Sequence, residues 1–395
     1  MSAAPLDARP SGLPPPSAAE REHSDRVVAH LVHMIAEAEG WISFADYMHA
    51  ALYAPGLGYY AAGAHKLGPA GDFVTAPELT PLFGQALAPQ LAQVLTQVAD
   101  GEIIEVGPGS GCLAADVLTT LAEQDALPAR YLLLEVSPDL RERQRRFLAA
   151  RVPELMPRVL WIDRLPEPWR GAVIANEVLD AVPAHLVARR GGAWFERGVT
   201  VDATTRLAFC DRPLAPGLLR NMAEERFPAG GDYTSEVNPA AEALVTTIGR
   251  GCDRGLMLLV DYGFPAAEYY HPQRDAGTLM AHYRHRALAD PFSYPGLVDM
   301  TAHVDFSAVA RAGLAGGMTV AGFTSQAQFL VACGLLDALA RSGDPQSAAY
   351  LRAANAVQKL TSAAEMGELF KALALTRELD IELVGFRDGD RSHRL

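Results

Sequence analysis

The residues with the clearest chemical meaning in this sequence are three glycines at alternate positions, Gly107, Gly109 and Gly111. A largely apolar run from Ile103 to Val106 precedes them and is typical of a buried parallel strand. The segment that follows has the apolar periodicity of a helix. A strand, a glycine turn and a helix place a ligand at the helix N-terminus, where unpaired N–H groups point outward. Glycine suits this turn because a Cβ would block the ligand and restrict φ.

The spacing of the glycines separates two classes of cofactor. The dinucleotide fingerprint needs a third small residue at position 112, where this chain has Cys112. Glu105 would repel a diphosphate and suits a cationic or amine-bearing ligand better. The pattern Glu-x-Gly-x-Gly-x-Gly, with Pro108 between the first two glycines, resembles motif I of class I S-adenosylmethionine-dependent methyltransferases. A tight turn in a ligand-free α/β domain is the alternative that this stretch leaves open.

Two further acids follow predicted strands. Glu135 ends the apolar strand that starts at Tyr131, and it comes 24 residues after Gly111. This is close to the separation at which a carboxylate accepts hydrogen bonds from ribose hydroxyls. Asp163 follows the strand predicted over 159–161 and could accept a hydrogen bond from an adenine amino group, because ligands lie beyond the carboxyl ends of such strands. A solvated acid in a loop is the alternative for each residue.

Polar side chains also follow the strand predicted over 172–175. Asn176, Glu177 and Asp180 should lie at the mouth of the same crevice, where a transferase presents groups to its acceptor. We expect Asn176 to contact the cofactor. The two carboxylates could hold a guanidinium in bidentate fashion and orient it for attack on an electrophilic methyl group.

A polar loop from Gly71 to Glu78 leads into a helix for which we expect Thr80 as N-cap and Pro81 as first residue. Such a loop can fold over a cofactor as a lid. We then expect Thr75 to contact the cofactor and Glu78 to orient the acceptor. An N-terminal helical layer packed on the sheet explains the same residues equally well.

Histidines and cysteines give little support for other chemistry. His282, His285, His303 and Asp305 could be imagined as metal ligands, but their spacing matches no known scaffold, so no metal is predicted. The four cysteines are scattered without a Cys-x-x-Cys pair. The sequence contains no Gly-x-x-x-x-Gly-Lys-Ser/Thr motif, which disfavours an NTPase.

The net charge of −13 makes general attraction to nucleic acid or to anionic membranes unfavourable. An acidic surface would instead favour a basic partner, such as a protein segment that carries arginine. The chain has no apolar run of membrane-spanning length and no secretory layout at its N-terminus. We therefore expect a cytoplasmic protein without a membrane span.

Strands and helices alternate along the chain and are interrupted by an antiparallel hairpin at 186–196 that turns at Gly191 and Gly192, which predicts an α/β fold with a parallel core sheet. We expect helices over 25–39, 238–251, 305–314, 325–341, 346–361 and 364–374, and a last strand over 381–386. The expected divisions are a disordered tail over 1–20, an N-terminal helical or lid region over 21–100, a core over 101–262 with a hairpin insert near 184–212, and a C-terminal substrate-side addition over 263–395.

Several motifs together make the resemblance more specific. They are Gly71-Asp-Phe-Val-Thr-Ala-Pro-Glu78, the glycine turn, Asn176-Glu177 through Pro183, Asp261-Tyr-Gly263, Thr301-Ala-His-Val-Asp-Phe306 and Met366-Gly-Glu-Leu-Phe-Lys371. They resemble the MidA family of class I methyltransferases over residues 26–386. The best-known member of that family is a mitochondrial complex I assembly factor that methylates an arginine of a complex I subunit.

The resemblance implies a Rossmann-like core with added N-terminal and C-terminal regions, S-adenosylmethionine as cofactor, and methylation of a protein arginine, with a respiratory complex I subunit homologue as one candidate substrate. The expected cofactor-binding residues are Thr75, Glu105, Gly107, Pro108, Gly109, Gly111, Glu135, Asp163 and Asn176, and the expected catalytic residues are Glu78, Glu177 and Asp180. The alternatives are an NAD(P)-dependent oxidoreductase and a non-catalytic assembly chaperone. The hairpin and the C-terminal helices could form the interface of a homodimer.

Overall fold

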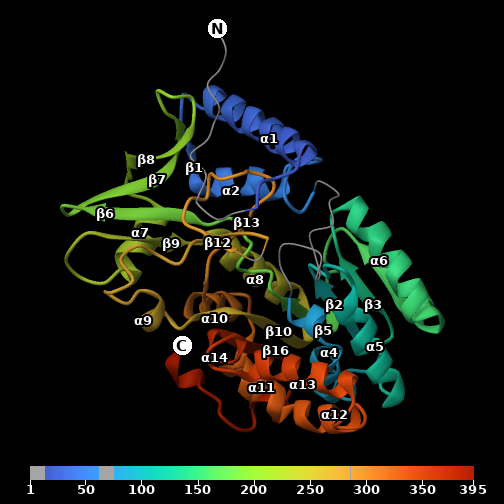
Figure 1. The fold of residues 1–395 in the computed structure, drawn as a ribbon. Helices are drawn as coiled ribbons and strands as arrows, with labels where there is room; N and C mark the ends of the chain where they lie inside the picture. The colour runs from blue at the N-terminus through green and yellow to red at the C-terminus, as the bar shows by residue number, and fades with distance from the viewer. Residues whose placement is uncertain (1–13, 62–74, 285) are drawn as a thin grey trace.

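The computed structural model describes residues 14–61, 75–284 and 286–395. Its centre is an eight-stranded sheet in the order β15-β16-β10-β5-β2-β3-β4, with β14 paired to β10 (Figure 1). The strands from β4 to β10 are parallel, whereas β16 runs antiparallel between β10 and β15. The strands are β2 (Glu102–Val106), β3 (Tyr131–Leu134), β4 (Val159–Ile162), β5 (Trp169–Asn176), β10 (Cys252–Phe264), β14 (Val304–Asp305), β15 (Thr319–Ser325) and β16 (Phe370–Arg377).

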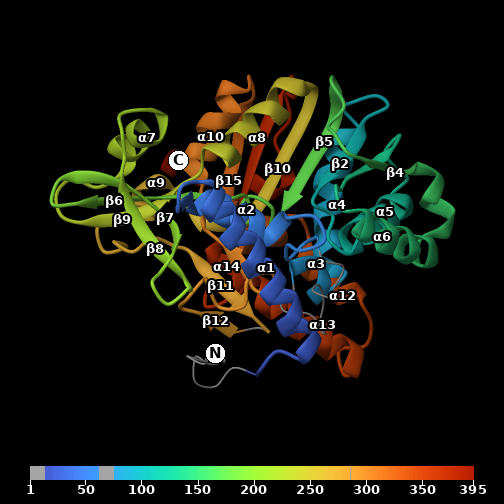
Figure 2. The ribbon, with the colours of Figure 1, turned by 90° about the horizontal axis from the view of Figure 1, so that it is seen from above.

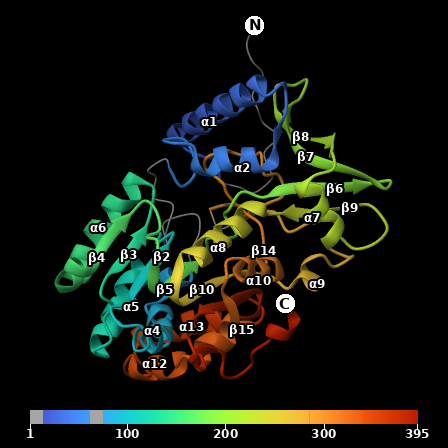
Figure 3. The same ribbon diagram turned by 180° about the vertical axis from the view of Figure 1, so that it is seen from behind.

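Helices cover both faces of this sheet because the side chains of each inner strand alternate between two apolar layers. On β5, Ile174 packs toward α4, α5 and α11 to α13, and Val173 packs toward α8 and α10. Helices α8 and α10 lie on the side seen in Figure 3. The helices are α4 (Leu82–Leu95), α5 (Cys112–Glu123), α6 (Pro138–Arg151), α8 (Pro239–Gly251), α10 (Phe306–Ala315), α11 (Gln326–Ala332), α12 (Leu335–Arg341) and α13 (Ala348–Thr361). The predicted α/β fold with a parallel core sheet is confirmed.

A second, antiparallel sheet stands to one side of the central sheet (Figure 2). Its first hairpin turns at Gly191 and Gly192, whose φ angles of 53° and 82° suit the tight turn that the sequence predicts. A small sheet of β12, β11 and β13 belongs to the same part of the fold. These strands are β1 (Ile42–Ser43), β6 (His185–Arg190), β7 (Ala193–Val201), β8 (Leu207–Pro213), β9 (Tyr233–Val237), β11 (Met280–Tyr283), β12 (Arg286–Leu288) and β13 (Asp299–Thr301).

The N-terminal helices pack on these antiparallel strands and on β13 through a shared apolar cluster. Helix α1 spans Ala18–Glu37 and α2 spans Phe44–Tyr53. The expected start of α1 at position 25 is wrong, because Ser17 and Glu20 form a capping box that begins the helix earlier. The predicted disordered tail over 1–20 is therefore wrong for its last residues, and its first thirteen lie outside the described residues.

Three expectations for the C-terminal region are also wrong. The helix expected over 364–374 is a short helix, α14 (Met366–Leu369), followed by strand β16, because pairing with both β10 and β15 overrides the helix propensity of its alanines and leucines. The helix expected over 325–341 is broken into α11 and α12 at Gly334, whose φ is 88°. The last strand expected over 381–386 is instead a 3₁₀ turn, η2 (Val384–Phe386). Phe386 of this turn packs on Phe329 of α11, with ring centres 5.3 Å apart.

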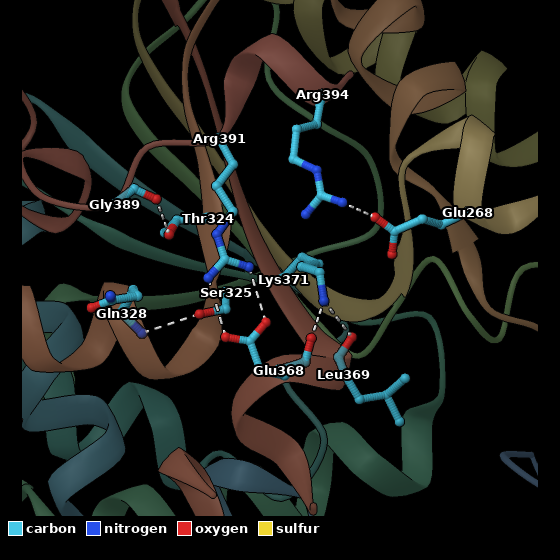
Figure 4. Close-up of polar contacts among 10 residues, drawn as sticks. All are labelled: Glu268, Thr324, Ser325, Gln328, Glu368, Leu369, Lys371, Gly389, Arg391 and Arg394. Atoms are coloured by element: carbon cyan, nitrogen blue, oxygen red, sulfur yellow. Dashed lines mark hydrogen bonds and ion pairs between the residues drawn. The ribbon is translucent and has the colours of Figure 1, made fainter. Parts of the chain in front are cut away.

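Polar contacts fasten the last residues of the chain to the central fold (Figure 4). Arg391 pairs with Glu368 of α14 at 2.9 Å, and Arg394 pairs with Glu268 of the short helix α9 (Ala266–Tyr269). Lys371, at the start of β16, donates to the carbonyl oxygens that end α14. We call this set of contacts the C-terminal clamp.

The remaining helical elements are short. They are α3 (Ala76–Leu79), α7 (Leu218–Arg226), η1 (Pro153–Arg158) and η3 (Ser392–Arg394). Within the described ranges, no helix combines the length and the apolar composition needed to cross a membrane.

Candidate active site

A cavity of about 330 Å³ opens beyond the carboxyl ends of β2, β3 and β5, where ligands bind in sheets of this kind. The glycine turn lies at one part of its wall, and tyrosines that follow α2 lie at another. The residues of its lining that bear on function are Tyr53, Tyr59, Tyr60, Thr75, Glu78, Glu105, Gly107, Pro108, Gly109, Glu135, Asn176, Glu177, Asp180 and Asp299.

The glycine turn has the backbone that the sequence predicts. Gly107, Gly109 and Gly111 have φ angles of 63°, 53° and 87°, in the left-handed region that favours glycine. A Cβ on Gly107 would lie 3.0 Å from a methyl group of Val178. Gly111 does not line the cavity; it is the N-cap of α5 and sets the direction of that helix.

Glu135 is held in place by a network that sequence reasoning missed. Its carboxylate accepts from the backbone N–H of Ser137 at 2.8 Å and from Nε2 of Gln144 at 3.2 Å. Gln144 is fully buried, also donates to the carbonyl of Gly109 at 2.8 Å, and accepts from the indole of Trp161 at 2.8 Å. One amide thus joins the glycine turn to Glu135. Gln144 lies between Leu140 and Leu148 on the inward stripe of α6, and this position is the sequence signal by which its burial could be predicted.

Glu105 lies on β2 beneath the glycine turn and is 3% exposed. The hydroxyl of Tyr131 donates to its Oε2 at 2.7 Å. Burial raises the pKa of Glu105 to about 8, and the hydrogen bond from Tyr131 opposes this shift only in part. When no cation is near, Glu105 at the cavity wall is therefore mainly protonated at neutral pH.

Asn176, Glu177 and Asp180 converge on the cavity as predicted, from the end of β5 and the turn after it. Oε1 of Glu177 accepts from Nδ2 of Asn176 and from the backbone N–H of Ala76, both at 3.1 Å. Within the described part of the chain, Oδ1 of Asn176, Oε2 of Glu177 and Oδ1 of Asp180 are buried without a hydrogen-bond partner. Three acceptor atoms are thus available for donors on a ligand.

The electrostatics of this turn favour a cation. Burial, with a smaller contribution from Asp180, raises the pKa of Glu177 to about 8. Burial also raises the pKa of Asp180 to about 6, although a hydrogen bond from the Tyr262 hydroxyl at 2.6 Å opposes the shift. A bound cation would favour the charged form of both acids and would lower both pKa values.

Asp261 holds the backbone of the turn after β5, and it is a second residue that sequence reasoning did not assign to the site. Its Oδ2 accepts from the backbone N–H groups of Val178, Leu179 and Asp180 at 3.1, 2.9 and 3.3 Å. It is 1% exposed at the end of β10, next to Tyr262. The strand therefore positions Asp180 through two adjacent side chains.

The remaining predicted residues lie in different settings. Thr75 and Glu78 line the cavity on either side of the start of α3, and residues 71–74 of the proposed lid lie outside the described residues. Helix α4 begins at Leu82 with Pro81 as N-cap, one residue later than predicted, and Thr80 accepts from Leu82. Asp163 is exposed after β4 and lines a separate surface hollow.

Among the described residues, no group of three or more His, Cys, Asp or Glu side chains could hold a metal ion. His285 lies outside the described residues. His303 stacks on Phe264 with ring centres 5.4 Å apart and packs edge-on against Tyr262 at 5.0 Å. Burial lowers the pKa of His303 to about 4. Its described surroundings are those of a neutral, packed side chain.

The charge of the cavity is one-sided. Six carboxyl groups line it, and its described lining contains no lysine, arginine or histidine; the six are Glu78, Glu105, Glu135, Glu177, Asp180 and Asp299. Such a wall attracts cationic ligands and disfavours a diphosphate. The arrangement can hold a positively charged group beside a glycine turn that admits a close ligand.

Comparison with known proteins agrees with this chemistry. The family described as "Putative S-adenosyl-L-methionine-dependent methyltransferase" matches residues 86–324. A crystal structure of a candidate methyl transferase from Burkholderia thailandensis bound to S-adenosyl-homocysteine is 48% identical, with a TM-score of 0.93. The alignment covers 97% of this chain and 100% of that one.

Curated relatives carry a more specific name. The mitochondrial protein arginine methyltransferase NDUFAF7 homolog of Drosophila melanogaster is 30% identical over 85% of this chain and 82% of the relative. The mitochondrial protein arginine methyltransferase NDUFAF7 of Danio rerio is 29% identical over 87% of this chain and 85% of the relative. The resemblance that the sequence motifs indicate is thus confirmed.

Proposed function

Because this chain belongs to that family of S-adenosyl-L-methionine-dependent methyltransferases, we propose that its methyl acceptor is a nitrogen of an arginine side chain in a protein. The observation that carries the proposal is the one-sided charge of the cavity, in which Glu177 and Asp180 each bury an acceptor oxygen that has no partner among the described residues. The names of the curated relatives support the same acceptor.

The described residues fit S-adenosylmethionine. The turn at Gly107 lacks the Cβ that would fill the space beside Val178, and Glu135 is oriented by Ser137 and Gln144 so that it can accept from ribose hydroxyls. Oδ1 of Asn176 is a further unpartnered acceptor for the cofactor. When bound, the cofactor supplies a methyl group that is already activated on a sulfonium.

The residues of the turn after β5 would act on the acceptor. Glu177 and Asp180 would accept hydrogen bonds from a guanidinium and fix its orientation, which lowers the entropic cost of the reaction. Asp261 and Tyr262 hold this turn rigid, and the buried position of the acids limits competing water. A bound guanidinium would favour the charged form of Glu177, and Oε2 of that carboxylate, which has no hydrogen-bond partner among the described residues, would then be placed to receive the proton that the acceptor nitrogen loses.

The proposal extends to the partner. A folded or flexible protein segment that carries arginine would approach the mouth of the cavity, and a respiratory complex I subunit homologue is the first substrate to test. The net charge of −13 would favour a basic segment of this kind.

Substitution of Glu177 tests the catalytic part of the proposal. Glu177→Gln keeps the shape of the side chain and removes its charge, so binding of S-adenosylmethionine should stay within about twofold while methyl transfer falls on the order of 10²-fold or more. Isothermal titration measures the binding, and transfer of a labelled methyl group to protein measures the activity. Glu123→Gln, on the exposed end of α5, is the matched control. Full activity of Glu177→Gln would remove Glu177 from the mechanism.

A further inference from the structure

Two tyrosines and an aspartate form a wall of the cavity that neither the glycine turn nor the turn after β5 supplies. Tyr53 ends α2 and Tyr60 follows it; their rings stack with centres 5.5 Å apart and planes 26° from parallel. The Tyr60 hydroxyl donates to Oδ1 of Asp299, at the start of β13, at 2.9 Å. Asp299 is 3% exposed. We call Tyr53, Tyr60 and Asp299 the tyrosine wall.

Hydrogen bonds join the tyrosine wall to the turn that carries Asp180. The Tyr53 hydroxyl donates to the carbonyl of Ala181 at 2.9 Å. The backbone N–H of Ala302, just after β13, donates to the carbonyl of Asp180 at 3.0 Å. Hydrogen bonds therefore join residues from the N-terminal region, from the core sheet and from the C-terminal part of the chain around the same space.

An unsatisfied group points to a ligand at this place. Asp180 is 4% exposed, and its Oδ1 has no hydrogen-bond partner among the described residues although it lines the cavity. Leaving a buried carboxylate oxygen unpaired costs free energy that a donor on a ligand would recover. A ligand that donates to Oδ1 of Asp180 would therefore lie beside the tyrosine wall.

The side chains of the tyrosine wall suit a planar cation better than a compact one. A guanidinium is planar, stacks on aromatic faces and presents several N–H groups in a fixed fork, whereas an ammonium is a compact point charge that keeps its water more strongly. Tyr53 and Tyr60 line the cavity together with the carboxylates of Asp180 and Asp299, so a planar cation would meet an aromatic surface and charged acceptors at the same place. We propose that Tyr53, Tyr60 and Asp299 form the subsite that selects a guanidinium over an ammonium as methyl acceptor, an inference that rests on the proposed function.

The protonation of the wall is consistent with this role. Burial raises the pKa of both tyrosines above the ordinary value, and the nearby Asp180 and Asp299 carboxylates raise it further. Both phenols thus stay protonated at neutral pH. Tyr60 remains a hydrogen-bond donor to Asp299 and holds that carboxylate toward the cavity.

The experiment measures binding of two small cations to the protein saturated with S-adenosyl-homocysteine. Ethylguanidinium and propylammonium are titrated by NMR into the wild-type protein and into Asp299→Asn, Tyr60→Phe and Tyr53→Leu. The controls are Asp337→Asn, on the exposed face of α12, and Tyr350→Phe, on α13. The affinity for S-adenosyl-homocysteine reports whether each variant keeps its fold.

We expect the wild type and the controls to prefer ethylguanidinium by about tenfold or more. Asp299→Asn and Tyr60→Phe should lower the affinity for ethylguanidinium about fivefold or more, with binding of S-adenosyl-homocysteine unchanged within twofold. Should Tyr53→Leu fail to fold, the two milder variants decide the matter. The inference is overturned if the wild type shows no preference, or if both milder variants keep the wild-type preference.

These outcomes are distinct from those of the proposed function. Methylation of protein arginine together with unchanged cation binding in the wall variants would overturn the subsite and leave the proposed function intact. Selective binding of ethylguanidinium that the wall variants lose, without any methyl transfer to arginine, would support the subsite and contradict the proposed acceptor.

Discussion

At the scale of single residues, Gly107 lies where the glycine turn leaves little room for a side chain. Its φ of 63° is strained for any residue with a Cβ, and that Cβ would lie 3.0 Å from Val178. We expect Gly107→Ala to cost about 1–2 kcal/mol of strain and to weaken binding of S-adenosylmethionine on the order of tenfold or more. Isothermal titration measures the affinity.

Gly191 provides the matched control for this substitution. Its φ of 53° carries a similar strain, but no atom lies within 4 Å of the position that a Cβ would take. Gly191→Ala should destabilise the hairpin slightly and leave cofactor affinity unchanged. Equal affinity in the two variants would show that the turn at Gly107 does not contact the cofactor.

The buried acids predict how stability depends on pH without ligand. Glu105 and Glu177 each have a pKa raised to about 8 from 4.5, so the folded protein holds these protons more strongly than the unfolded chain does. Their contribution is complete below pH 4.5 and is lost as pH rises through about 8. We expect the unfolding temperature of the ligand-free protein to fall as the pH rises from 5.5 to 8.5.

The variant Glu105→Gln should remove part of this dependence, on the order of 1–3 kcal/mol across the window, because the amide carries no titratable proton. Calorimetry at matched ionic strength measures both proteins. Identical slopes for the wild type and the variant would mean that Glu105 titrates at an ordinary pKa in the folded protein.

Among the elements, the C-terminal clamp fastens the last residues to α14 and α9. We expect Arg391→Ala to lower the free energy of unfolding by about 0.5–1 kcal/mol, because the pair with Glu368 is only partly shielded from solvent, and to lose this effect in high salt. Chemical denaturation measures the change. Arg387→Ala is the control, because its contact with Glu382 is more exposed and is 3.9 Å long. Equal stability of the two variants would show that the clamp contributes nothing.

The sequence predicts the parallel strands well because both faces of each strand are buried, which leaves continuous apolar runs such as Leu256 to Val260. It does not predict β16, since Phe-Lys-Ala-Leu-Ala-Leu has a composition that favours helix when read alone. Only its position between β10 and β15, two partners distant in the sequence, decides for a strand. Such pairing cannot be derived from local pattern.

The candidate site likewise contains some residues that the sequence could predict and others that it could not. Glu135, Glu177 and Asp180 could be found because each follows an apolar strand, and strand ends in a parallel sheet share one edge. Asp299 and Tyr60 come from parts of the chain with no such rule; their hydrogen bond joins positions 239 residues apart. The inward stripe of α6 indicates that Gln144 is buried, but its hydrogen bonds to Gly109 and Glu135 depend on the tertiary structure.

On the scale of the whole molecule, the cavity is assembled from three parts of the chain. The core sheet supplies the glycine turn and the acids at strand ends, the N-terminal region supplies Tyr53 and Tyr60, and β13 supplies Asp299. A ligand that fills this space contacts all three parts at once. Binding of S-adenosylmethionine should therefore stabilise the protein as a unit.

Protein arginine is the methyl acceptor that we propose for this methyltransferase. The most direct measurement incubates the purified protein with S-adenosylmethionine carrying a labelled methyl group and with an extract of cells that lack the protein, followed by complete hydrolysis and identification of the labelled amino acid. We predict label in methylated arginine, and none above background with Glu177→Gln. Label confined to another amino acid or to small molecules would contradict the claim.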